Sequence, residues 1–119
     1  MTDFERFDVV TALFPFLDVP RRKPRPVLVL SAKAFNALHG HVVGAMITTG
    51  AASHWPSDHV IHDLAPAGLS HRSVIRWKVF TLPFAEIGRR IGHLSETDRR
   101  TFGAACEAIL PGSPVRSGA

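Results

Sequence analysis

Short apolar runs separated by turn-forming residues limit the folds open to this chain more than any other feature. The runs are rich in β-branched and aromatic residues, which favour strands, and Pro, Gly, Ser and Asp gather between them. They predict strands at residues 8–16, 27–30, 42–49, 59–63, 73–83 and 89–94. Many short strands in a chain of 119 residues indicate a mainly β fold with some helix, a compact barrel or sandwich of about five to seven strands.

The connections between these runs are expected to be loops. Residues 17–26 are rich in Pro and Arg, residues 50–58 carry Gly, Ser, Pro and Asp, and residues 64–72 are rich in turn formers. Residues 32–40 are short and mixed, and predict a single helical turn or an irregular connection. The run at 27–30 is apolar on both faces and therefore predicts a central strand.

Residues 95–110 predict a C-terminal amphipathic helix. Ser95 suits its N-cap, and the acidic residues Glu96 and Asp98 suit the positive end of the helix dipole. One apolar face is predicted, with spacings of three, four and seven residues: Phe102, Cys106, Ile109 and Leu110. The Pro-Gly pair at 111–112 is expected to end the helix.

The length of the chain and its cysteine content indicate the number of domains and the cellular compartment of the protein. A chain of this length predicts one domain, placed at residues 1–111, with a disordered tail at 112–119. No apolar run approaches the ~20 residues that span a bilayer, and the first ten residues do not resemble a secretory signal. The single cysteine, Cys106, excludes an internal disulfide and is expected to be a small buried residue. We therefore expect a cytoplasmic protein with no membrane partner.

The charge of the chain indicates an acidic partner. The formal net charge is +4 and the isoelectric point is about 10.2, which favours nucleic acid or an acidic protein segment. Basic residues cluster at 21–25, 72–78 and 89–100. The seven histidines are scattered, and no cysteine pair or acidic cluster accompanies them, so neither a metal site nor a cofactor is expected.

The most distinctive local stretch is RRKPRPVLVLS at residues 21–31, where basic residues adjoin a core strand. Pro24 and Pro26 fix their own φ angles and restrict the residues before them, so Arg25 is mounted on stiff backbone. A positioned arginine binds phosphate oxygens in two places and stays charged. The stretch thus indicates an anion site, while a solvated loop charge is the plainer alternative.

Six pieces of the sequence, taken in order, resemble the PemK/MazF family of type II toxins. They are FDVVTALFPFLD, KPRPVLVLS, VVGAMITTG, WPSD, AGLSHRSVIRWKVFTL and IGHLSETD. The resemblance runs over residues 7–110 and implies a small SH3-like β-barrel, assembled as a homodimer. It also implies a cytoplasmic, metal-independent endoribonuclease that cleaves single-stranded mRNA and is neutralised by an antitoxin, here expected to carry an acidic segment.

The resemblance also assigns catalytic residues. The family's Arg-Pro matches Arg25 and the following proline, and its strand-ending threonine matches Thr48; the two form the catalytic pair in well-studied members. The expected reaction is attack of a ribose 2′-hydroxyl on the adjacent phosphate. Arginine stabilises the charge of the phosphorane, and Thr48 positions the phosphate through its hydroxyl. In isolation, Thr48 is equally an ordinary strand residue.

Further residues are predicted to bind RNA or to transfer protons. The predicted RNA-binding residues are Lys23, Thr49, Trp55, Arg76 and Lys78. Some family members carry an acidic acid/base residue two positions after the arginine that corresponds to Arg76, but this chain has Lys78 there. The proton acceptor is then Asp58, His54 or His59, or no dedicated base exists. Asp58 is also a candidate turn-capping residue.

Two other functions remain open on the sequence alone. One is a protein-binding poison of DNA gyrase, as in the related CcdB branch of the same fold. The other is an inactive member that binds its antitoxin and little else. The intact Arg-Pro and Ile-Thr-Thr elements favour the endoribonuclease.

Overall fold

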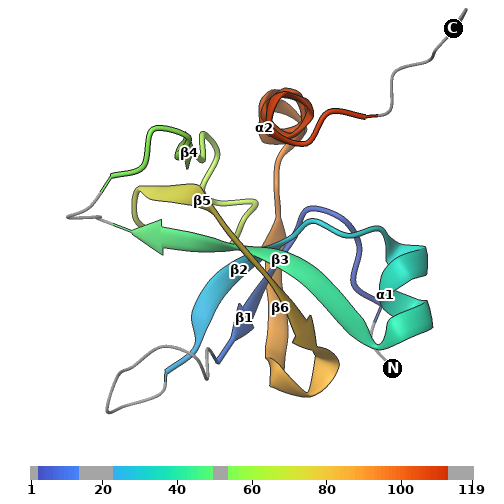
Figure 1. Ribbon diagram of the computed structural model, residues 1–119. Coiled ribbons are helices and arrows are strands. Elements are labelled where there is room, and N and C mark those ends of the chain that lie inside the picture. The colour runs from blue at the N-terminus through green and yellow to red at the C-terminus, as the bar shows by residue number, and fades with distance from the viewer. Residues whose placement is uncertain (1–2, 14–22, 50–53, 113–119) are drawn as a thin grey trace, which may run out of the picture.

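The structure is a computed structural model that describes residues 3–13, 23–49 and 54–112. The strands are β1 (Asp8–Ala12), β2 (Arg25–Val29), β3 (His41–Thr49), β4 (His59–Val60), β5 (Ser73–Pro83) and β6 (Ile87–His93). The helices are α1 (Lys33–His39) and α2 (Glu96–Ile109), with a short 3-10 turn at Phe84–Glu86 (Figure 1). The mainly β prediction with a C-terminal helix is confirmed.

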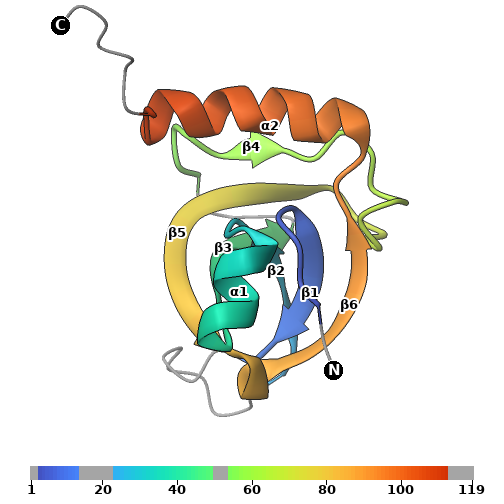
Figure 2. The same ribbon diagram turned by 90° about the vertical axis from the view of Figure 1, so that its right-hand side faces the viewer.

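All six strands belong to one antiparallel sheet, in the order β4-β5-β3-β2-β1-β6. The long strand β5 curves around the other strands, which gives the sheet a barrel-like outline (Figure 2). In the described ranges no ladder joins the edge strands β4 and β6, so the sheet is not closed as the predicted barrel would be. The strand β2 is central, as the apolar run predicts, because both of its faces are buried.

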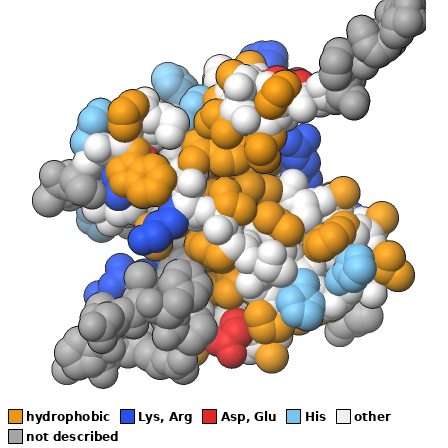
Figure 3. All heavy atoms as spheres, in the orientation of Figure 1, with side chains coloured by type: hydrophobic (Ala, Val, Ile, Leu, Met, Phe, Trp, Pro, Cys, Tyr) orange, Lys and Arg blue, Asp and Glu red, His pale blue; other side chains and the backbone are white. Residues whose placement is uncertain are grey.

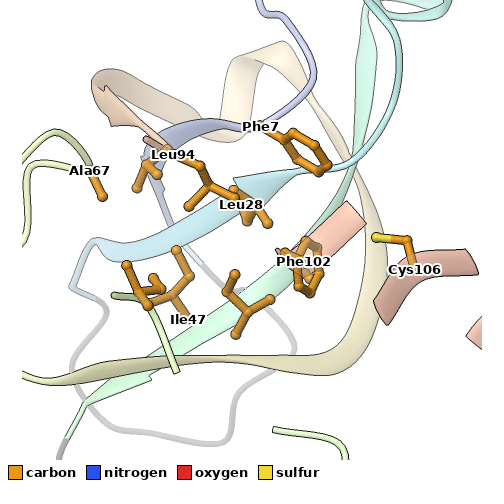
Figure 4. Close-up of a cluster of buried hydrophobic side chains, with 11 residues drawn as sticks. Phe7, Leu28, Ile47, Ala67, Leu94, Phe102 and Cys106 are labelled. Carbon is orange, nitrogen blue, oxygen red and sulfur yellow. The ribbon is translucent and has the colours of Figure 1, made fainter. Parts of the chain in front are cut away.

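Two hydrophobic clusters cover the two faces of the sheet. The larger cluster lies under α2, where Leu28, Ile47 and Phe102 converge (Figure 4). The smaller cluster lies on the other face and contains Val27 and Val29. Adjacent residues of β2 thus point into different cores, as strand geometry requires.

The structure corrects the prediction for residues 32–40. The helix α1 has seven residues, rather than the single turn that the mixed sequence indicates. A tertiary contact stabilises it: Asn36 is buried and donates through Nδ2 to the carbonyl oxygen of Phe4 at 2.9 Å. Gly40 ends the helix in the left-handed region at φ 63°. The sequence does not reveal this contact, because the two residues are far apart along the chain.

The helix α2 follows its prediction at the start and departs from it at the end. The Ser95 hydroxyl accepts the backbone N–H of Asp98 at 3.1 Å, so the predicted N-cap is confirmed. Phe102 and Cys106 are buried, as predicted. Ile109 and Leu110 are instead 39% and 65% exposed, so the buried face ends at Cys106.

The strand boundaries also shift by a few residues. The strand β2 begins at Arg25, inside the predicted loop 17–26, and β6 begins at Ile87. The predicted strand and loop residues 14–22 and 50–53, and the tail 113–119, lie outside the described residues. Within the described part of the chain, neither helix is long and apolar enough to cross a membrane.

Candidate active site

The predicted catalytic residues Arg25 and Thr48 lie at the ends of neighbouring strands. The β2–β3 ladder pairs Val27 with Met46, and continuing this antiparallel register by two residues sets Arg25 opposite Thr48. The ladder itself begins at Val27, directly after Pro26, which has no N–H to donate. The two strands are therefore not paired with each other where these two side chains lie, although each is paired along its other edge, Arg25 with Ala12 and Thr48 with Val74.

A cleft of ≈ 140 Å³ opens at this end of β2 and β3. It is lined by Arg25, Pro26, Met46, Ile47, Thr48 and Thr49. Arg25 and Thr48 are partly exposed, so a guanidinium and a hydroxyl are accessible in one small cavity. The structure thus brings together the predicted pair and adds Met46 and Ile47, which lie in the family motif VVGAMITTG but are not among the predicted site residues.

Beside this cleft, Arg76 forms a buried ion pair with Asp58. Arg76 donates through Nε to Asp58 Oδ1 at 3.0 Å and through its terminal nitrogen to Oδ2 at 2.8 Å. Their side chains are 9% and 6% exposed. The Arg76 guanidinium also lies 5.4 Å from the centre of the Trp55 ring. Arg76 could also have been an ordinary strand residue with its charge facing solvent. The structure instead buries the Arg76 side chain in an ion pair.

The ion pair changes what Asp58 can do chemically. Hydrogen bonds from the Arg76 guanidinium lower the pKa of Asp58 below its ordinary value of 3.8, although burial opposes this shift. The same contact raises the pKa of Arg76. A carboxylate with a lowered pKa is ionised at neutral pH and is a weak proton acceptor. This geometry favours a structural role for Asp58 over a role as general base.

The two candidate histidines lie in different places. His59 pairs with Ile75 across β4 and β5, and its ring lies 5.2 Å from that of Phe102 in α2. Because Ile75 and Arg76 are adjacent on a strand, His59 is on the opposite face from Arg76. Burial lowers the pKa of His59. His54 is exposed in the loop before β4 and adjoins Trp55.

The remaining predicted residues are exposed, and one of them lines the cleft. Thr49 is exposed and lines it, while Lys23 is exposed two residues before Arg25. Lys78 is exposed on β5, in the stretch where the register with β3 shifts. Lys and Arg side chains gather beside a large hydrophobic side chain at the left of the face shown in Figure 3. Among the described residues, no group of three or more His, Cys, Asp or Glu side chains could hold a metal ion.

The fold and this cleft define the class of the protein. Residues 5–109 match the model of a family described as the PemK-like, MazF-like toxin of type II toxin-antitoxin system. The chain belongs to this family, and the resemblance seen in the sequence is confirmed.

Solved structures of the same fold cover nearly the whole chain. An endoribonuclease in complex with its cognate antitoxin, from a mycobacterial species, is 21% identical with a TM-score of 0.70, over 98% of this chain and 100% of that one. The Mycobacterium tuberculosis toxin MazF-mt6 is 24% identical with a TM-score of 0.67, over 85% and 93%. A MazE-MazF structure from Deinococcus radiodurans is 19% identical with a TM-score of 0.72, over 95% and 100%. A search of curated protein sequences gives no match.

Proposed function

We propose that this protein is the toxin of a type II toxin-antitoxin pair and an endoribonuclease that cleaves single-stranded mRNA. The observation that carries the proposal is the shared cleft of Arg25 and Thr48, which presents one phosphate-binding cation and one hydroxyl. Family membership supports it, and so do the relatives described as endoribonucleases. No observation in the structure favours a gyrase poison or an inactive member.

In the proposed reaction, a ribose 2′-hydroxyl attacks the adjacent phosphorus and the 5′-oxygen leaves. The bond formed is 2′-O–P and the bond broken is P–O5′. The products are a 2′,3′-cyclic phosphate and a 5′-hydroxyl, with one proton lost from the nucleophile and one gained by the leaving oxygen. Arg25 stabilises the negative charge that grows on the phosphorane, and Thr48 holds a phosphate oxygen by donating its hydroxyl hydrogen. Chemistry of this kind needs no metal ion.

The partner assignments follow from the same cleft. An antitoxin with an acidic segment would compete with RNA for Arg25 and its basic neighbours, and two relatives are MazE-MazF structures. A homodimer and a cytoplasmic location complete the proposal, on the family resemblance. Lys23, Thr49, Trp55 and Lys78 are proposed to hold the RNA strand, and the remaining predicted RNA-binding residue, Arg76, is buried in its ion pair with Asp58 and is proposed to act indirectly.

Substitution of the two catalytic residues tests the proposal. Arg25→Ala and Thr48→Ala are each expected to lower kcat/KM on single-stranded RNA in EDTA at least about a hundredfold, because each removes a stabiliser of the phosphorane. The matched controls are Arg100→Ala and Thr97→Ala, two exposed residues of α2, which should cleave at the wild-type rate. Wild-type cleavage by a folded Arg25→Ala variant would refute the assignment.

A further inference from the structure

The loop before β4 is tied to β5 by one carboxylate, and this link points to a role for Asp58 that the sequence leaves open. We propose that Asp58 is a positioning residue: through Arg76 it holds the Trp55 ring as a stacking platform for an unpaired base beside the Arg25–Thr48 cleft. This inference rests on the proposed function, since it names how the RNA strand is held next to the cleft.

The carboxylate of Asp58 makes three contacts at once. Both of its oxygens accept hydrogen bonds from Arg76, at 3.0 Å and 2.8 Å. Its Oδ2 also accepts the backbone N–H of Trp55 at 3.1 Å, and the Asp58 N–H donates to the Trp55 carbonyl at 3.0 Å. The turn from Trp55 to Asp58 is therefore closed on itself and fastened to β5.

The same arrangement fixes the indole ring. The Arg76 guanidinium lies 5.4 Å from the ring centre, within cation–π range, while Trp55 stays 38% exposed. An exposed aromatic ring on a fixed mount is what stacking with an unpaired base requires. Trp55 lies outside both hydrophobic clusters, so core packing does not explain why its ring is held in place.

The platform adjoins the cleft through the sheet. Arg76 pairs with Met46 across β5 and β3, and Met46 lines the cleft. Met46 in turn pairs with Val27 of β2, two residues from Arg25. Arg76, which supports the platform, and the cleft thus lie on three neighbouring strands, which are about 4.8 Å apart in a sheet. A strand of RNA with its phosphate in the cleft would place a flanking base within reach of Trp55.

This role differs from that of a general base. A proton acceptor must be accessible to the 2′-hydroxyl, whereas the carboxylate of Asp58 is buried and already accepts three hydrogen bonds. The lowered pKa of Asp58 agrees with this distinction, because it reduces the basicity of the carboxylate. In this chain the carboxylate beside the arginine of β5 therefore comes from a loop, and Lys78 stands where some family members carry an acidic residue.

A double-mutant cycle tests the link between Asp58 and Trp55. The probe is a fluorescein-labelled single-stranded RNA with 2′-O-methyl groups throughout, which removes the nucleophile. Asp58→Asn and Trp55→Ala are each expected to raise its Kd about tenfold, the size of a lost stacking contact. The double variant should bind no more weakly than Trp55→Ala alone, because the first change acts through the second. Multiplied effects, or wild-type binding by Asp58→Asn, would overturn the proposal.

Asp8→Asn is the matched control, because Asp8 also forms a 2.8 Å ion pair with an arginine, Arg90, on the β1–β6 side of the sheet. The Asp8→Asn variant should bind the probe as the wild type does. Equal weakening of binding by Asp8→Asn and Asp58→Asn would indicate general destabilisation and would count against the proposal. If Asp58→Asn does not fold, Arg76→Lys replaces it, since lysine keeps the charge but loses the two-point contact and should weaken binding to the same extent.

Steady-state cleavage separates positioning from proton transfer. Asp58→Asn should raise KM about tenfold and leave kcat and the acidic limb of its pH profile in place. Loss of kcat with an unchanged KM would identify Asp58 as the proton acceptor and overturn the inference. If the wild-type protein binds the probe but cleaves no RNA, the proposed endoribonuclease activity is refuted and the positioning role of Asp58 is not. If the wild-type protein does not bind the probe, both proposals are refuted.

Discussion

At the scale of single residues, the candidate active site depends on how firmly two polar groups are held. Arg25 is the first residue of β2 and lies between two prolines, which limit the conformations of its backbone. Thr48 is a β-branched residue with a restricted χ1 angle, on a strand paired along its other edge with β5. The backbone of Arg25 and the χ1 angle of Thr48 are therefore restricted before a phosphate binds, which reduces the conformational entropy lost on binding. This rigidity supports the proposal that the two residues are catalytic.

The ionised form of Asp58 stabilises the fold. Arg76 holds the pKa of Asp58 below its ordinary value of 3.8, so the stabilisation is complete above that pH and is lost as the pH falls through the pKa of the folded state. We expect the difference in free energy of unfolding between the wild type and Asp58→Asn to be largest near neutral pH and to shrink below pH 3.8. Urea unfolding over a pH series measures this difference, and a constant difference would contradict the account.

At the scale of elements, we expect the contact of α2 with β4 to weaken at acidic pH. His59 lies between these elements, with its ring against Phe102, and burial lowers its pKa below 6.5. Near neutral pH the neutral ring is present in the folded and the unfolded chain alike. As the pH falls below 6.5, the unfolded chain takes up the proton first, so the folded chain loses stability.

Replacement of His59 by an aromatic residue that does not titrate tests this contact. His59→Phe keeps a ring against Phe102, so the free energy of unfolding should fall less between pH 7 and pH 5 than it does in the wild type. Thermal or urea unfolding at the two pH values gives the comparison. An unchanged pH dependence would show that His59 is not the group responsible.

The elements also show what could be predicted from the sequence and what could not. Strands with regular apolar patterns and the N-cap at Ser95 depend on local chemistry, and their predictions are confirmed. The helix α1 depends on the distant contact of Asn36 with Phe4, which no local pattern reveals. The exposed end of α2 has a similar cause, because periodicity shows which residues share a face but not how far the covering sheet extends.

The candidate site likewise contains residues that the sequence predicts and contacts that it does not. The family motifs identify Arg25 and Thr48, and the register of β2 and β3 explains why two residues far apart in sequence line one cleft. The ion pair between Asp58 and Arg76 could not be predicted, because it depends on the path of a loop that returns to β5. The same loop path changes the interpretation of Asp58 from a candidate base to a support.

At the scale of the whole molecule, exposed apolar side chains indicate an association surface. Ile109 and Leu110 at the end of α2 and Val79 on β5 are 39%, 65% and 44% exposed. The face in Figure 3 shows hydrophobic side chains continuing from α2 onto the sheet below it. Exposed apolar area of this kind favours self-association.

Solution mass tests the proposed homodimer. We expect sedimentation equilibrium to give about twice the chain mass of 13.0 kDa at micromolar concentration. Leu110→Glu places a charge in the apolar surface and should shift the equilibrium toward the monomer, while Leu38→Glu on α1 serves as the exposed control. A wild-type mass of one chain at these concentrations would contradict the dimer.

The chemistry of the cut ends shows whether the Arg25–Thr48 cleft cleaves RNA by attack of the 2′-hydroxyl of the RNA. Single-stranded RNA is incubated with the protein in EDTA, the cuts are mapped, and the new ends are analysed by mass spectrometry. The account predicts a 2′,3′-cyclic phosphate or its opened 3′-phosphate, a 5′-hydroxyl, and no product with Arg25→Ala. New 5′-phosphate ends, or identical cleavage by Arg25→Ala, would contradict it.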